Sequence, residues 1–528
     1  MADLYFILPG VAPSKGGVQE VGNKAWNLML MAQAGLPVPP AFVLPTSWCR
    51  RDRPARGPLL PQTLAAGIAR LESATGLAFG AARRPLLVSV RSGAAVSMPG
   101  MMETVLDVGL NAETVEGLIR LTGNPRLAWD SYRRLVQGYA EVVANLSAAP
   151  FDALVAEALA RAEAENEREL DHRDLRALTL AMLDCYRTLT GAAFPADPHE
   201  QLAAAAEAVF RSWDAPKAAS YRRMNAISDD AGTAVTVQTM VFGNAGGASG
   251  AGVGFTRNPA TGKREFYFDF QCNGQGADVV AGRQKLRDND RLRVELPAVW
   301  TRLNDVCHAL EVLFGDAQDF EFTVQSGVLY LLQARRAKRT DWAALMIAVD
   351  MVEEGLLTPA EGLARLDGID LNAVVRTSFA APVPETLAEA QVASMGVASG
   401  AVALDPDAVK RLTAAGTPAI LVRRDTVTSD IEGMALATGI LTASGGRTSH
   451  AAVVARQLGK VCLVACPGLE IDPDRGRCRI GGVLLNEGDF LSLDGNTGAV
   501  YAGRLEPVTE RPERALAVIA GWRRAAAA

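Results

Sequence analysis

Residues 439–466, GILTASGGRTSHAAVVARQLGKVCLVAC, determine how the C-terminal half of the chain is expected to fold. The stretch begins with an apolar run at 439–442, breaks at a Gly-Gly pair and continues with a helical pattern from His450 to Leu458. A second apolar run follows at 462–465. This strand-helix-strand alternation is typical of an α/β unit. We therefore expect a compact α/β domain at about 390–505.

The start of the expected helix is a candidate phosphoryl-transfer site. His450 lies in the first turn, beside backbone N–H groups that have no partner within the helix. The positive end of the helix dipole there disfavours an imidazolium and favours a bound anion. A neutral imidazole is a nucleophile, and the same N–H groups would stabilise a phosphoryl group attached to it. The residues alone leave open the alternative that His450 only packs or caps the helix.

Working toward the N-terminus, polar side chains follow two adjoining expected strands at 320–324 and 329–333, with a turn at Gly327. Asp319 and Glu321 are two residues apart and share one strand face, as do Gln333 and Arg335 on the next strand. Two acids, an amide and an arginine suit Mg²⁺ and a polyphosphate. The solvated face of a hairpin with cross-strand ion pairs is the alternative interpretation.

Two small-residue segments are further candidates for phosphate contacts. Arg91 precedes SGAAVSMPGMMET at 92–104, and six glycines lie between 243 and 254. Small residues let the backbone approach a ligand, and the N–H groups of a glycine-rich tip can surround phosphates. An ordinary turn and a flexible hairpin tip are the corresponding alternatives. The chain contains neither a P-loop nor a dinucleotide fingerprint.

Composition excludes several classes of protein. The chain has 53 Lys and Arg against 59 Asp and Glu, a net charge of −6, which excludes a generally basic nucleic-acid-binding surface. No apolar run approaches the ~20 residues that a membrane-spanning helix needs. The seven scattered cysteines fit reduced thiols, and the first residues lack the features of a signal peptide. We therefore expect a cytoplasmic protein without nucleic-acid or membrane partners.

Several long blocks resemble the pyruvate phosphate dikinases, within the wider group of phosphoenolpyruvate-using enzymes that have a swivelling phosphohistidine domain. The resemblance covers most of the chain. It is carried by GNKA (22–25) with GLPVPP (35–40), VSVRSGAAVSMPGMMETVLDVGLN (88–111), DSYRRLVQ (130–137), GTAVTVQTMVFGN (232–244), GFTRNPATG (254–262), DFEFTVQSGVLYLLQARRAKRT (319–340), DIEGM (430–434) and the stretch at 439–466.

The resemblance implies an α/β fold in four parts. An ATP-grasp nucleotide-binding region is expected at 1–340, with a helical insertion at about 112–225. A helical linker at 341–385 follows, then a swivelling phosphohistidine domain at 386–510 and a C-terminal tail at 511–528, a short amphipathic helix with a frayed end.

The resemblance also implies roles for single residues. The residue matching His450 accepts a phosphoryl group from ATP, and Arg335 takes part in this transfer. Those matching Lys24, Arg91 and Arg335 hold the ATP phosphates. Asp319, Glu321 and Gln333 serve the nucleotide, and Glu321 and Gln333 also serve Mg²⁺. Thr448 matches a regulatory phosphorylation site of some members.

Two departures from the family pattern qualify this interpretation. Ala277 stands where the family usually has Glu, so one carboxylate near the nucleotide is lost. The chain also has no room for the barrel that binds pyruvate or phosphoenolpyruvate. We therefore expect ATP and phosphate to yield AMP and pyrophosphate, with pyruvate served by a separate barrel-containing chain. An antibiotic-type phosphotransferase and a nucleotide-binding regulator without turnover remain as alternatives.

Overall fold

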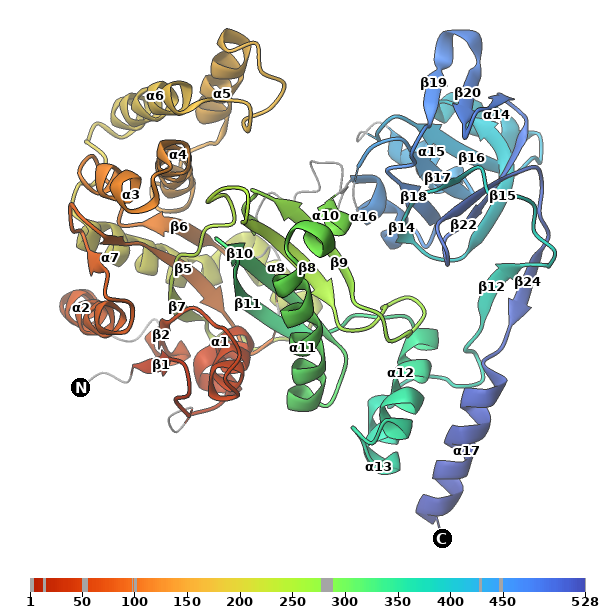
Figure 1. Ribbon diagram of the computed structural model, residues 1–528, viewed down its shortest axis with the longest axis horizontal. Helices are drawn as coiled ribbons and strands as arrows, with labels where there is room; N and C mark the ends of the chain where they lie inside the picture. Colours follow the sequence, from red (N-terminus) through yellow and green to blue (C-terminus); the bar gives the residue numbers. More distant parts are fainter. Residues whose placement is uncertain are drawn as a thin grey trace. The chain divides into compact units, whose positions relative to one another are not determined.

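The computed structural model describes residues 4–12, 16–49, 56–96, 98, 102–276, 288–426, 430–445 and 450–527 (Figure 1). Contacts divide the chain into two compact units, which are described separately. The first unit contains Met1–Gly250 and Phe320–Arg335, and the second contains Ala251–Asp319 and Arg336–Ala528.

A five-stranded sheet forms the centre of the first unit, with the strand order β1-β2-β7-β5-β6. Every residue of the strands β2 and β7 is buried, so both faces of the sheet are covered. This burial explains why these strands read as continuous β-branched and apolar runs. The strands are β1 (Tyr5–Ile7), β2 (Ala41–Leu44), β5 (Val88–Gly93), β6 (Thr104–Val108) and β7 (Ala234–Thr239).

Helices pack on this sheet and continue beyond it. Helix α1 (Val18–Gln33) contacts β1, β5 and β7, and α7 (Pro198–Arg211) contacts β5, β6 and β7. The expected helical region at 112–225 is helical, and within it α4 and α6 pack side by side (Figure 1). Its helices are α3 (Thr114–Thr122), α4 (Pro125–Val142), α5 (Ala149–Arg161), α6 (His172–Thr190), α7 and α8 (Pro216–Met224), while α2 (Arg56–Thr75) precedes it.

A four-stranded sheet has the order β11-β10-β8-β9. The strands β10 (Gln318–Gln325) and β11 (Val328–Arg336) are joined by a turn in which Ser326 and Gly327 have positive φ, 49° and 80°. This confirms the turn expected at Gly327. The strand β8 (Gly250–Phe255) belongs to a different sheet from β7. The glycine-rich segment therefore connects two sheets and is not a hairpin tip. The remaining elements here are β9 (Tyr267–Cys272), α10 (Asp288–Glu295) and α11 (Pro297–Phe314).

Within the second unit, an eight-stranded sheet has the order β13-β23-β22-β15-β16-β17-β18-β14. The pairs β15–β16, β16–β17 and β17–β18 are parallel, which confirms the predicted α/β alternation. Apolar residues of these strands form separate cores on the two sides of the sheet. The elements are β13 (Ala388–Glu389), β14 (Gln391–Ser394), β15 (Val397–Ala403), α14 (Pro406–Ala414), β16 (Ala419–Arg423), α15 (Ile431–Leu436), β17 (Gly439–Thr442), α16 (His450–Gln457), β18 (Val461–Val464), β22 (Phe490–Asp494) and β23 (Ala499–Ala502), with a small sheet of β19 (Glu470–Asp472), β20 (Arg477–Ile480) and β21 (Val483–Asn486).

The expected helical linker at 341–385 is helical only in its first part, α12 (Asp341–Glu353) and α13 (Pro359–Arg365). Residues Arg376–Phe379 form the strand β12, which pairs antiparallel with β24 (Pro507–Glu510). The expectation of a mostly helical segment was wrong here because the partner strand lies more than a hundred residues away in the sequence. No local pattern reports such a pairing.

The C-terminal segment forms the amphipathic helix expected from its sequence, and this helix continues to Ala527. Helix α17 (Glu513–Ala527) places Ala515 and Ile519 in a core with Leu345 and Val349 of α12. Burial of this apolar stripe stabilises the helix. Among the described residues, no helix is both long and apolar enough to cross a membrane. Among the described residues, no disulfide bond joins the cysteines.

Candidate nucleotide and phosphohistidine sites

Lys24 is positioned by an unusually close backbone contact. Gly22 has a positive φ of 77°, and a Cβ atom there would lie 2.2 Å from the carbonyl oxygen of Gly93 at the end of β5. The N–H group of Asn23 donates a hydrogen bond of 3.0 Å to the Ala94 carbonyl. Only glycine fits at this position. The contact therefore presses the start of α1 against the strand that carries Arg91.

Arg91 connects the predicted site residues of the first unit. Its Nη2 lies 3.5 Å from Oε2 of Glu321 on β10. Its Nη1 donates to Oε1 of Gln238 on β7 and to the Leu332 carbonyl on β11, each at 3.4 Å. Asn27 on α1 donates from Nδ2 to the Ala334 carbonyl at 2.9 Å. Elements far apart in the sequence thus meet around one guanidinium group.

The charges in this cluster act strongly on Lys24. The pKa of Lys24 is lowered to about 7, chiefly by burial of the ammonium group, although the residue as a whole is only half-buried. Arg91 and Arg335 also lower this pKa, and Glu321 opposes them. Two arginines and only one carboxylate act on this lysine, so the basic groups outnumber the acidic groups around it. The charges of Lys24, Arg91, Glu321 and Arg335 thus act on one another, and their excess of basic groups makes the cluster a candidate site for an anion.

The donor set fits a divalent cation held jointly with a polyphosphate. Glu321 is about one-third exposed and Gln333 is half-buried on the neighbouring strand, whereas Asp319 is buried. Within the described ranges, no group of three or more His, Cys, Asp or Glu side chains could hold a metal ion alone. Mg²⁺ characteristically takes one or two protein oxygens and completes its shell with phosphate oxygens and water. Glu321 and Gln333 can supply those two protein ligands.

Sequence reasoning missed two polar residues that support this cluster. Gln238 is 1% exposed and receives a hydrogen bond from Arg91. Asn27 lies three residues after Lys24 and holds β11 by its backbone. Helical spacing could have indicated Asn27, and a buried amide on the expected strand at 234–241 could have indicated Gln238.

His450 is the first residue of α16, as predicted, and follows the carboxyl end of the parallel strand β17. Ala451, Ala452 and Ala455 are buried, so the helix lies against the sheet through small side chains. The side chain of His450 is outside the described part of the structure, and so are Thr448 and Ala277. The predicted placement of the histidine at a helix N-terminus is confirmed for its backbone.

A pocket of about 660 Å³ lies at the carboxyl ends of β16, β17 and β18. Arg424 and Ser444 follow β16 and β17, and Ala465 follows β18 with a positive φ of 50°. Ligands of open α/β sheets bind outside the carboxyl ends of the parallel strands. The pocket therefore lies at the sheet edge from which the chain proceeds to His450.

Comparison with known proteins assigns a class to both parts. Residues 57–302 match the family model described as pyruvate phosphate dikinase, AMP/ATP-binding domain. Residues 416–498 match the model described as PEP-utilising enzyme, mobile domain. The fold and the two matches define a nucleotide-binding protein that also has the mobile domain of the phosphoenolpyruvate-utilising enzymes.

Similarity to individual proteins extends over nearly the whole chain. The pyruvate, phosphate dikinase of Clostridium symbiosum is 42% identical over 493 residues, which are 92% of this chain and 56% of that protein. The enzyme of Rhizobium meliloti is 39% identical over 516 residues, 94% of this chain and 57% of that protein. The enzyme of Giardia intestinalis is 41% identical over 510 residues, which are 95% of this chain and 58% of that protein. The chain belongs to the pyruvate phosphate dikinase family and spans little more than half the length of these relatives.

Proposed function

We propose that the chain performs the nucleotide half of a pyruvate phosphate dikinase-like reaction. ATP and orthophosphate react with the imidazole of His450, which receives the β-phosphoryl group. The γ-phosphoryl group joins orthophosphate as pyrophosphate, and AMP is released. The observation that carries this proposal is the convergence of Lys24, Arg91 and Arg335 around Glu321, because three basic side chains beside one carboxylate suit a polyphosphate with a divalent cation.

In this proposal the side chains of the cluster have separate tasks. Lys24 and Arg91 bind the phosphate oxygens, and Arg335 neutralises the negative charge that develops during transfer. Glu321 and Gln333 would hold Mg²⁺, whose charge would screen the phosphates from the attacking nitrogen, and Asp319 supports the nucleotide. The N-terminus of α16 stabilises the phosphoryl group on His450 through backbone N–H groups.

The phosphorylated histidine needs an acceptor, which we propose to be pyruvate bound by a separate barrel-containing chain. A phosphoimidazole is an energy-rich phosphoryl donor, and the reaction is completed only when another molecule accepts the phosphoryl group. We assign nucleotide binding to 1–340, phosphohistidine chemistry to 386–510, and the connection between them to 341–385 and the end of the chain. A single histidine that serves two acceptors has to move between them. The reduced thiols suit a cytoplasmic location.

Labelling of the histidine tests the proposal. Incubation with ATP labelled at the β-phosphate, Mg²⁺ and phosphate should give a phosphoprotein that is labile in acid and stable in base. The His450→Ala variant should take up no label, and Glu321→Ala should lose labelling while it stays folded. Glu157→Ala, on an exposed ion pair of α5, is the matched control and should label normally. Equal labelling of wild type and His450→Ala would refute the proposal.

Measurement of AMP separates this enzyme from a regulator that only binds ATP. An active phosphotransferase releases AMP and pyrophosphate in proportion to the phosphohistidine formed, whereas a regulator releases neither. The chain alone should exchange ATP with AMP and pyrophosphate without making phosphoenolpyruvate from pyruvate. Addition of a barrel-containing chain should restore that product in wild type and leave His450→Ala inactive.

A further inference from the structure

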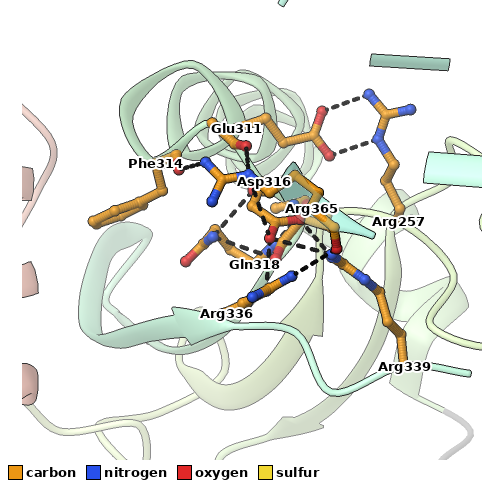
Figure 2. Close-up of polar contacts among 11 residues, drawn as sticks. Arg257, Glu311, Phe314, Asp316, Gln318, Arg336, Arg339 and Arg365 are labelled. Atoms are coloured by element: carbon orange, nitrogen blue, oxygen red, sulfur yellow. Dashed lines mark hydrogen bonds and ion pairs between the residues drawn. The ribbon is translucent and has the colours of Figure 1, made fainter. Parts of the chain in front are cut away.

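Asp316 is a nearly buried carboxylate surrounded by arginines at the junction between α11 and β10 (Figure 2). Nε of Arg336 lies 2.8 Å from its Oδ2. Arg339 forms a bidentate pair with the same carboxylate, with Nη2 3.2 Å from Oδ2. Nε of Arg365 lies 4.0 Å away. The side chain of Asp316 is 4% exposed, and its carboxylate thus lies within 4.0 Å of three arginine side chains.

Further bonds around Asp316 join the ends of four elements. Arg365, the last residue of α13, donates from Nε to the Gly315 carbonyl at 3.1 Å, at the C-terminus of α11. Arg336 donates from Nη2 to the Arg365 carbonyl at 3.3 Å. The N–H group of Ala337 donates to the Ala317 carbonyl at 2.9 Å, which extends the pairing of β10 and β11. The carboxylate therefore closes the open end of this hairpin.

The same hairpin carries the proposed nucleotide residues. Arg335 and Arg336 are neighbours at the end of β11, so their side chains point to opposite faces of the sheet. Arg336 pairs with Asp316, whereas Arg335 acts on Lys24 on the other face. Glu321 lies on β10, five residues after Asp316. A shift at the base of the hairpin would therefore move both Arg335 and Glu321.

We propose that Asp316 is a positioning residue of the nucleotide site. Its pairs with Arg336 and Arg339 fix β10 against β11 and so hold Glu321 and Arg335 in the register that phosphate and metal binding require. This inference rests on the proposed function of the chain. Misplacement of a reacting group by about 1 Å can cost roughly 10²-fold in rate, so a fixed hairpin base has a direct catalytic consequence.

A second ion-pair cluster nearby provides a useful contrast. Arg257 is fully buried and donates to both carboxylate oxygens of Glu311, each at 2.9 Å (Figure 2). Its Nη2 also donates to Oε2 of Glu354 at 2.8 Å. This cluster connects the segment after β8 with α11 and the end of α12, and so has a packing role. The Asp316 cluster differs because two of its arginines belong to β11 and to the segment that directly follows it.

The charge of Asp316, and not only its volume, is required in this arrangement. Arg339 is 5% exposed, and the loss of its counter-charge would leave a buried guanidinium without a paired carboxylate. The substitution Asp316→Asn keeps the shape but removes the charge. Arg339 would then turn toward water, Arg336 would lose its ion pair, and the end of β11 would be released.

The test compares Asp316→Asn with Asp130→Asn. Asp130 is also a buried aspartate paired with two arginines, Arg133 and Arg134, but it lies in the helical region on α4. Both substitutions should lower the melting temperature by similar amounts. Only Asp316→Asn should reduce the rate of His450 labelling at saturating ATP, by tenfold or more, and weaken calorimetric binding of a non-hydrolysable ATP analogue with Mg²⁺ by at least threefold. Asp316→Glu should recover part of both losses.

A double-mutant cycle gives a readout that general destabilisation would not produce. The double variant combines Asp316→Asn with Arg336→Gln. If Arg336 acts through Asp316, the rate of His450 labelling in the double variant should be no lower than in the slower of the two single variants. Additive losses, normal labelling and binding by a folded Asp316→Asn protein, or an equal loss in Asp130→Asn would overturn the inference. If wild type binds the analogue but never labels His450, the proposed function fails, and the binding comparison still decides the role of Asp316.

Discussion

Gly22 and Gly93 meet through their backbones alone, and a Cβ atom on Gly22 would lie 2.2 Å from the carbonyl oxygen of Gly93. This contact brings the helix that carries Lys24 to the strand that carries Arg91. In the short GNKA motif, Gly22 is therefore required for packing, and Lys24 supplies the basic side chain.

The substitution Gly22→Ala should disrupt the nucleotide site more than its size suggests. The added methyl group meets a backbone carbonyl, and alanine also resists the positive φ of 77°. We expect a loss of about 2 kcal/mol or more in the free energy of unfolding, measured with urea, and a tenfold or larger loss of ATP-analogue affinity. Gly17→Ala, where no atom lies within 4 Å of the new Cβ, should leave both unchanged. Normal affinity in Gly22→Ala would show that the contact does not set the position of Lys24.

Binding of ATP should change the protonation of Lys24. Its pKa is about 7 in the free protein, and phosphate oxygens should raise this pKa toward its usual range. At pH 8 the free lysine is mostly neutral, so binding of an ATP analogue should take up close to one proton, and the affinity should fall as the pH rises above 7. Calorimetry in buffers of different ionisation enthalpy measures this uptake. Lys24→Met should bind more weakly, and uptake that persists in it would assign the proton to another group.

Asp107 should make the stability of the protein depend on pH. Its carboxylate is fully buried, and this burial raises the pKa of Asp107 to about 7, although Arg134 opposes the shift. Because the pKa of Asp107 is higher in the folded state, at about 7, than the value of 3.8 expected in the unfolded state, protonation favours folding. This contribution to stability is complete below pH 3.8 and is lost as the pH rises through 7. Asp107→Asn should therefore be more stable than wild type at pH 8, by about 1–3 kcal/mol, and no more stable at pH 4.

Asp130 provides the control of opposite sign for this prediction. Burial alone would raise its pKa, but Arg134 and Arg133 outweigh burial and lower the pKa of Asp130 to about 2. Asp130→Asn should therefore be less stable than wild type at pH 7, and the difference should shrink as the pH falls from 4 toward 2. Urea unfolding across the pH range measures both variants. A stability of Asp107→Asn equal to that of wild type at pH 8 would show that burial of this carboxylate costs nothing.

Ile519 should contribute to stability as a core residue although it lies in the last helix. It is 1% exposed and packs in the core that α17 forms with α12. Ile519→Ala should cost about 2–4 kcal/mol of the free energy of unfolding. Arg514→Ala, on an exposed side chain of the same helix, should cost less than about 1 kcal/mol. A near-neutral Ile519→Ala would mean that α17 is only loosely attached.

Local sequence patterns predicted some elements well and others poorly. The strand at Gly439–Thr442 and the helix that begins at His450 were placed correctly, because each contains its own start and stop signals. The strand β12 was missed because its partner β24 lies far away in the sequence, whereas the amphipathic helix expected near the C-terminus is present as α17. Pairings between distant segments leave no periodicity in either segment.

By itself, the sequence determined the family, the α/β character and the identity of the candidate ligands, since motifs such as GNKA and SGGRTSHAAVVARQLGK specify both chemistry and local backbone. Only the tertiary structure brought Lys24, Arg91, Glu321 and Arg335 together and lowered the pKa of Lys24. It alone also revealed Gln238 and Asp316 as their supports. The reason is physical: electrostatic interactions and hydrogen bonds depend on distance in space. That distance is fixed by sheet pairing and core packing across hundreds of residues, whereas a motif fixes only its immediate neighbours.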